Sequence, residues 1–171
     1  MFSFYHKNEN KLYINLVELS RNIFFYKNVG LKDSFDTRLI LLFFHFSIIL
    51  LINKDKQENK KKIQKSFDNI FLNIEYDLRE KGHGDVAVNK KMKNFNKIFY
   101  DILIKINKSK NVSFRANVEL FNKHINNKEQ INIFLDQLED YFNSFHNFCL
   151  ELSIKDIING DIKFTYKHGS T

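Results

Sequence analysis

The residue types that most often carry chemistry in proteins are thinly spread along this chain of 171 residues. Its histidines are His6, His45, His83, His124, His146 and His168. None of them stands at the spacing of a helical zinc pair, such as HxxxH or HExxH. Cys149 is the only cysteine, which excludes an internal disulfide and a cluster of thiolate ligands. We therefore expect no metal site and no cofactor.

Motifs for nucleophilic or phosphate chemistry are missing as well. Gly82-His83-Gly84 lacks the third glycine and the preceding strand of a dinucleotide-binding loop. No GxSxG motif and no Cys–His arrangement is visible. We expect a protein that is not an enzyme and that works by binding another protein. A deep pocket gathering Arg38, His45 and Asp85 would favour an enzyme instead.

Three polar residues still stand out from this background. His45 lies in an apolar stretch, where it is either a ligand for a small molecule or, as we favour, a core histidine hydrogen-bonded to a neighbour. Arg38 and Arg79 are notable because arginine is rare in this chain. Each could join two helices through a carboxylate such as Asp36, Asp77 or Asp85, or could contact a partner.

The composition favours helices as the elements that position these residues. With 0 prolines and 5 glycines, little is present to break a helix or to build the tight turns of a β-sandwich. Apolar residues recur at helical spacing in 12–26, 39–52, 63–78, 92–106, 114–125 and 131–152. We predict an all-α, single-domain bundle of about six helices over residues 1–171, with a tail over 160–171.

The apolar run 39–52 decides between a core helix and a membrane span. Its helix would be about 21 Å long, against about 30 Å for the hydrocarbon of a bilayer. His45 and Ser47 interrupt it, and charged residues bound it. A helix that is apolar on nearly every side is typical of the centre of a bundle. We expect 39–52 to be that central helix.

Several residues have the character of helix ends. Residues 28–30 form a plausible C-cap, and Asp33 or Ser34 can cap the helix that follows. The clearest break is 81–85, where Gly82 suits a left-handed C′ position. Asp85 or Asn89 can cap the next helix.

The net charge of +7 favours anionic partners. Two helical stripes of lysine could form a basic rim, and the alternative for each is a merely solvated face. The stripes are Lys54, Lys61 and Lys65, and Lys90, Lys93 and Lys97. Sequence-specific nucleic-acid binding is not expected. Because Met1–Lys11 contains no apolar run, we expect a cytoplasmic protein, with peripheral contact to the inner membrane or the ribosome.

Four pieces of sequence resemble one family, the ubiquinol–cytochrome c chaperones. Phe35-Asp36-Thr37-Arg38 precedes a Leu-rich helix, and 77–85 reads DLREKGHGD. Val88-Asn89-Lys90-Lys91-Met92-Lys93 and Phe99-Tyr100 follow. Order and spacing agree over about 31–106 and loosely to 125. Asn89 replaces the family's helix-starting proline, and Lys91 an arginine.

The resemblance implies an all-helical assembly factor for the cytochrome bc1 complex, in a form like that of the bacterial members. Its client would be cytochrome b or another bc1 subunit, with a second assembly factor as a further partner. The residues that the motifs mark as partner-binding are Arg38, His45, Arg79, Gly82, Gly84, Asp85, Lys90, Lys91 and Lys93. A basic helical adaptor for anionic membrane or ribosomal RNA is the alternative.

Overall fold

The computed structural model describes residues 10–55, 59–109, 118–125 and 128–166, and these form helices and connecting turns without a strand. Eight α-helices follow one another: α1 (Lys11–Ser20), α2 (Phe35–Asn53), α3 (Lys60–Glu80), α4 (Asp85–Ser109), α5 (Val118–His124), α6 (Lys128–Ile133), α7 (Leu135–Leu150) and α8 (Ile154–Ile158). A π-helical turn, η1 (Phe24–Asn28), lies between α1 and α2. The predicted all-α class is confirmed.

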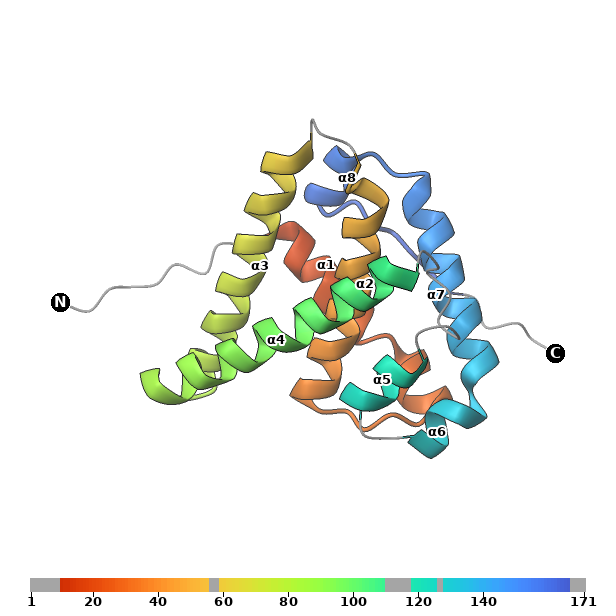
Figure 1. The fold of residues 1–171 in the computed structure, drawn as a ribbon, viewed down its shortest axis with the longest axis horizontal. Helices are drawn as coiled ribbons and strands as arrows, with labels where there is room; N and C mark the ends of the chain where they lie inside the picture. Colours follow the sequence, from red (N-terminus) through yellow and green to blue (C-terminus); the bar gives the residue numbers. More distant parts are fainter. Residues whose placement is uncertain (1–9, 56–58, 110–117, 126–127, 167–171) are drawn as a thin grey trace.

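The apolar helix α2 lies at the centre of the bundle, as predicted. In Figure 1, α4 crosses in front of α2, α1 packs behind it, and α7 flanks it. By length and composition alone α2 could cross a membrane, but 67% of its most apolar window is buried inside the molecule. The apolar residues from Leu39 to Ile49 are almost fully buried. The neighbouring helices therefore replace lipid as the surroundings of this segment.

Phenylalanine rings fill the core on both sides of α2. Phe43 packs against Phe71 of α3 and Phe99 of α4, with ring centroids 5.8 and 5.3 Å apart. On the other side, His45 meets Tyr141 and Phe145 of α7 at 5.6 and 4.8 Å. Aromatic pairs at these distances add packing energy to the burial of their surface.

Local signals set most of the helix ends. Ser34 accepts a hydrogen bond from the Thr37 backbone N–H at 3.2 Å and caps α2, as one of the two predicted options. Gly82 has a φ of 85° after α3, which is the left-handed conformation expected there. Asp85 is the first residue of α4.

Two features of the fold differ from the sequence predictions, and one prediction falls outside the described residues. The described residues form eight α-helices rather than about six, because the last long helix divides at Phe134 and α8 follows it; the expected helix 12–26 ends at Ser20 before η1. Phe114, expected in the fifth helix, lies outside the described residues. Residues 161–166 form no helix, yet Ile162 is buried and Phe164 contacts Phe145 and Phe148, so the expected tail packs on the core as far as Tyr166.

Candidate functional site

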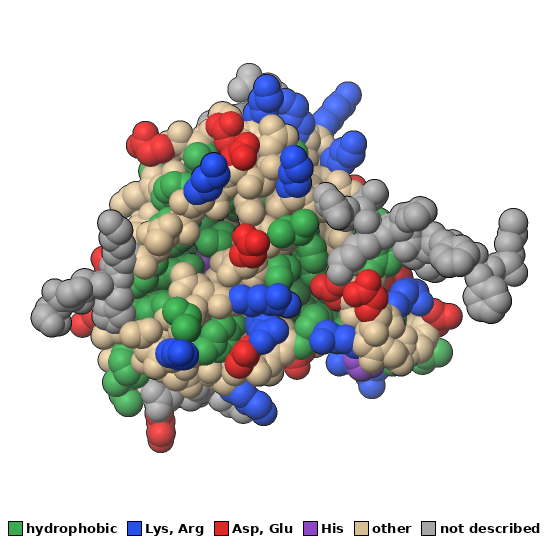
Figure 2. Space-filling model, turned by 180° about the vertical axis from the view of Figure 1, so that it is seen from behind, with side chains coloured by type: hydrophobic (Ala, Val, Ile, Leu, Met, Phe, Trp, Pro, Cys, Tyr) green, Lys and Arg blue, Asp and Glu red, His purple; other side chains and the backbone are tan. Residues whose placement is uncertain are grey.

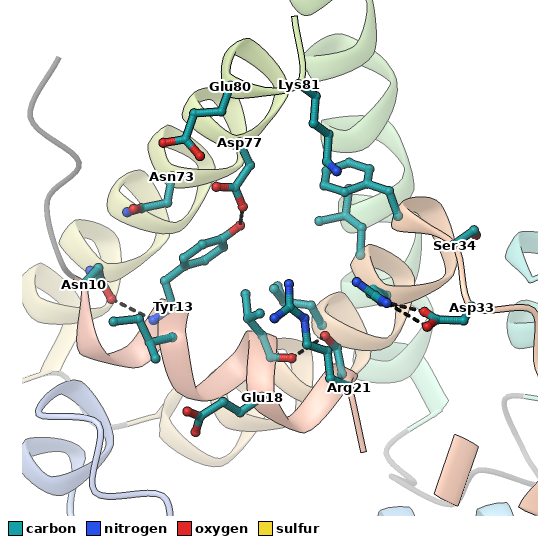
Figure 3. A pocket seen from close by; sticks show the side chains of 17 residues that line it. Asn10, Tyr13, Glu18, Arg21, Asp33, Ser34, Asn73, Asp77, Glu80 and Lys81 are labelled. Carbon is teal, nitrogen blue, oxygen red and sulfur yellow. Dashed lines mark hydrogen bonds and ion pairs between the residues drawn. The ribbon is translucent and has the colours of Figure 1, made fainter. Parts of the chain in front are cut away.

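The first candidate site is a groove of about 680 Å³ between α1, the start of α2 and the end of α3. We call it the α1–α3 groove. Its apolar lining is Ile14, Val17, Phe35, Leu39 and Leu42, and its charged lining is Glu18, Arg21, Asp33, Arg38, Asp77, Glu80 and Lys81. Figure 3 shows Arg21 and Lys81 pointing into the space between the helices.

Much of the polar lining of this groove is bonded within the protein. The Arg38 guanidinium donates to both carboxylate oxygens of Asp33, at 2.6 and 2.7 Å. This hydrogen bonding holds the pKa of Asp33 below its usual range. The Tyr13 hydroxyl donates to Asp77 at 2.5 Å across the gap between α1 and α3, as Figure 3 shows. Such pairing lets charged groups line a groove without each needing water.

Lys81 and Phe35 contact one another in the lining of the α1–α3 groove. The Lys81 ammonium lies 5.1 Å from the centroid of the Phe35 ring, within range of a cation–π contact. Ile14, which lines the groove from α1, keeps 43% of its surface exposed. The groove therefore offers apolar surface between neutralised charges, an arrangement suited to a peptide segment that is apolar in the middle and polar at its ends.

The second candidate site is a groove of about 740 Å³ on the α4 side of α2, which we call the lysine groove. Leu39, Ile40, Phe43, Phe95 and Ile98 form its apolar floor. Lys90, Lys91, Lys93 and Lys97 line it, with Asp36 and His124 at its edge. Four cations against one carboxylate make this groove strongly basic, so an anionic or amphipathic partner fits it best.

Asp101 anchors α5 beside the lysine groove. It accepts hydrogen bonds from Lys123 at 2.8 Å and from His124 at 2.9 Å, and pairs with Lys105 at 3.0 Å. Burial of the Asp101 carboxylate opposes ionisation, but hydrogen bonds from Lys123, Lys105 and His124 outweigh it and lower its pKa. Burial keeps the pKa of His124 below 6.5 despite this carboxylate.

His45 lies in the core, as the favoured interpretation predicts. Its Nδ1 is 2.7 Å from the Leu41 carbonyl oxygen, which can only accept, so Nδ1 carries the proton. Nε2 then accepts a hydrogen bond from the Tyr141 hydroxyl at 3.0 Å. Burial lowers the pKa of His45 to about 4 and keeps the ring neutral. Its role here is to join α2 to α7.

The residues predicted to bind a partner fall into separate places. Arg38 lines the α1–α3 groove, and Lys90, Lys91 and Lys93 line the lysine groove. Arg79 bonds Asp85 and Glu75 near the α3–α4 turn that contains Gly82 and Gly84. Arg38, His45 and Asp85 do not share a pocket, so the arrangement that would favour an enzyme is not formed.

The two predicted lysine stripes have different outcomes. Lys90, Lys93 and Lys97 are exposed along α4, as expected. Lys54 caps the end of α2, whereas Lys61 and Lys65 belong to α3, so the stripe through all three was wrong. Lys and Arg side chains do gather at the upper end of the molecule in Figure 2, where Figure 1 shows α2 passing into α3.

Sequence reasoning singled out Arg38 of the α1–α3 groove but missed Tyr13, Arg21 and Lys81. Tyr13 and Asp77 are 64 positions apart, and no local pattern pairs them. Arg21 and Lys81 stand just after α1 and α3, where a basic residue is usually explained by the helix dipole. Only the fold brings them to one space.

Cys149 and the acidic residues offer no further chemistry. The Cys149 thiol is buried, which raises its pKa to about 12. Within the described ranges, no three His, Cys, Asp or Glu side chains gather as metal ligands. We therefore take the two grooves as the candidate sites.

Comparison with known proteins agrees with the sequence motifs. A family model described as ubiquinol-cytochrome C chaperone matches residues 27–164. The match extends beyond the 31–106 region recognised from motifs and includes the last third of the chain. Searches of curated proteins and of solved structures find no significant match.

Proposed function

The chain belongs to the ubiquinol–cytochrome c chaperone family, and we propose that it holds apolar segments of cytochrome b, or of another bc1 subunit, during assembly of the complex. The proposed action is binding and release, without catalysis. We further propose a cytoplasmic location at the surface of the inner membrane. Contacts with a second assembly factor and with the ribosome remain predictions from the family resemblance.

The observation that carries this proposal is the lining of the α1–α3 groove. A segment of a membrane protein outside the bilayer has an apolar body and polar ends. The groove presents the partly exposed side chains of Ile14, Val17 and Phe35 to the body, while Arg21 and Lys81, which point into the groove, can meet polar ends. Burial contributes about 25 cal/mol per Å² of apolar surface removed from water, so contact with these partly exposed side chains gives reversible rather than permanent binding.

The charges of the groove also suit a transient complex. Asp33 and Arg38 already satisfy one another, so an arriving apolar segment does not have to strip water from an isolated charge. Figure 2 shows the face opposite to α4, with hydrophobic side chains exposed in its hollowed middle between acidic and basic ones. A surface that mixes apolar and charged side chains allows a client to be released as well as bound.

The decisive experiment is crosslinking from this groove in cells that assemble a bc1 complex. A photo-crosslinking residue at Ile14, which lines the groove, should capture cytochrome b in membranes. The same residue at Ile23, which is 58% exposed and outside the groove, is the matched control. Capture from both positions, or from neither, would contradict the assigned site.

Deleting the gene tests the function itself. Cells without the protein should lose cytochrome b haem absorbance and quinol–cytochrome c reductase activity, because unprotected apolar segments aggregate or are degraded. An Ile14→Asp variant should restore these signals poorly, whereas Ile23→Asp should restore them fully. Unchanged haem absorbance and activity after deletion would overturn the proposal.

A further inference from the structure

The exposed face of α4 carries a second feature that the α1–α3 groove does not explain. Six exposed residues fall within about 80° of arc on this helix. They are Val86, Lys90, Lys93, Lys97, Tyr100 and Ile104, which we call the α4 stripe. The stripe spans about 27 Å, because each residue of an α-helix rises 1.5 Å. In Figure 1, α4 lies at the outside of the bundle, in front of α2.

All charged residues of the α4 stripe are lysines. Both acidic residues of the helix lie off the stripe and are already paired with cations. Asp85 bonds Arg79, and Asp101 bonds Lys105, Lys123 and His124. The lysines of the stripe therefore face outward with no carboxylate of α4 to neutralise them.

Apolar side chains stand at both ends of the same stripe. Val86 is 85% exposed, Tyr100 47% and Ile104 49%. Binding at a membrane–water boundary combines buried apolar surface with electrostatic attraction to anionic lipid, and the stripe offers exposed apolar side chains and lysines on one face. Tyrosine prefers that boundary because its ring is apolar and its hydroxyl polar.

We propose that the α4 stripe docks this protein on a bilayer of anionic phospholipid. Lys90, Lys93 and Lys97 contact lipid phosphates, while Val86, Tyr100 and Ile104 enter the headgroup layer. This assignment rests on the proposed function for its setting and names the surface that makes the peripheral contact. Nucleic acid fits less well, because its phosphates would face the apolar ends of the stripe.

The lysine groove lies beside the stripe and adds a concave, apolar-floored surface next to its lysines. Lys90, Lys93 and Lys97 belong to both, and the floor of the groove contains Phe95 and Ile98. A phosphate placed among these lysines has apolar surface directly behind it. The α1–α3 groove uses the other side of α2, so a docked molecule keeps it clear of the lipid.

Vesicle binding tests this inference directly. The full chain should sediment with vesicles of phosphatidylcholine and phosphatidylglycerol, far less with phosphatidylcholine alone, and less again at high salt. Each lysine near an anionic surface contributes about fivefold to binding, so Lys90→Glu, Lys93→Glu and Lys97→Glu together should weaken it about 100-fold or more. Equal binding by this triple variant would overturn the assignment.

A matched control separates the stripe from the overall charge. Lys60→Glu, Lys61→Glu and Lys62→Glu change the charge equally on an exposed part of α3. This variant should keep most vesicle binding. If it loses as much as the stripe variant, or if the protein binds RNA or an acidic polypeptide but not anionic vesicles, the inference fails.

Fluorescence can report the depth of the stripe. The chain contains no tryptophan, so Tyr100→Trp introduces a single probe. Its emission should shift to the blue with anionic vesicles, whereas a probe at Ile133, which is 69% exposed on α6, should not shift. Shifts at both positions, or at neither, would contradict the orientation.

The two proposals fail in different ways. In detergent, the stripe variant should still capture cytochrome b, because its α1–α3 groove is intact. Normal client capture with no wild-type vesicle binding would refute only the lipid surface. Vesicle binding through the stripe with no client captured would refute only the proposed client.

Discussion

The α1–α3 groove and the lysine groove share α2 as a wall, yet they hold charge in different ways. In the first, three cations stand among four carboxylates, and Arg38 and Asp33 bond one another directly. In the second, four lysines face one carboxylate. The net charge of +7 is therefore not spread evenly over the molecule. The nearly balanced charge of the α1–α3 groove suits an apolar client, and the excess positive charge of the lysine groove suits an anionic surface.

The largest expected effect comes from the core that both grooves share. Phe43→Ala should lower the free energy of unfolding by about 3–5 kcal/mol, because it leaves a cavity against Phe71 and Phe99. Urea unfolding measures this loss, and client capture and vesicle binding should decline together. Leu150→Ala, at a residue 54% exposed, should cost about 0.5 kcal/mol or less. Loss of one activity alone in Phe43→Ala would show that the two sides are independent units.

Acid should destabilise the fold, and with it both grooves, through protonation of His45. Its pKa is 6.5 in an unfolded chain and about 4 in the fold, so the folded state binds fewer protons between these values. Stability is therefore complete above pH 6.5 and falls toward pH 4, by about 1.4 kcal/mol per pH unit at most.

Urea unfolding at pH 7 and pH 5 tests this dependence on His45. In His45→Gln the difference between the two pH values should shrink to the part that His124, whose pKa is also lowered, contributes. A difference as large as in the wild type would show that another group carries the effect.

Gly160→Ala should disturb the α1 side alone. Gly160 has a φ of 74°, and an added Cβ would lie 2.7 Å from the Lys11 Cβ and 2.9 Å from the Lys11 carbonyl oxygen. We expect a loss of about 2 kcal/mol and weaker client capture, with vesicle binding retained. Asn159→Ala, at the exposed neighbouring position, is the control. Equal loss of both activities would contradict a local effect.

The smallest effect is expected at the α3–α4 turn, which joins a helix of the α1–α3 groove to the helix of the lysine groove. Gly82→Ala should cost about 1 kcal/mol, because a φ of 85° is unfavourable for a residue with a Cβ. Gly84→Ala should be close to neutral, since its φ is ordinary and its Cβ would meet nothing within 4 Å. Thermal unfolding of the two variants gives the comparison. Equal melting temperatures would mean that the turn relaxes at little cost.

Sequence patterns predicted what depends on nearby residues. Ser34 as a cap, Gly82 in the left-handed region and 39–52 as the central helix follow from neighbours along the chain. The buried His45 was also predictable, because most of its neighbours along the helix are apolar. The exposure of Lys90, Lys93 and Lys97 was predictable as well, because they recur at helical spacing on one stripe.

What depends on distant residues could not be predicted. Lys54 was assigned to a stripe with Lys61 because the turn before α3 contains no glycine or proline to mark it. The packing of Ile162 and Phe164 depends on helices that lie far away in sequence. The Tyr13–Asp77 bond is of the same kind, which is why the α1–α3 groove was missed.

The first turns of α2 carry one consequence for anyone who wishes to separate the two activities. Leu39 lines both grooves, so enlarging it would narrow both at once and could not distinguish them. Neighbouring positions do distinguish them, because successive residues of a helix point about 100° apart. Arg38 faces only the α1–α3 groove, and Asp36 faces only the lysine groove. Within about one helical turn, the protein thus has one position that affects each groove alone, Arg38 or Asp36, and one that affects both, Leu39.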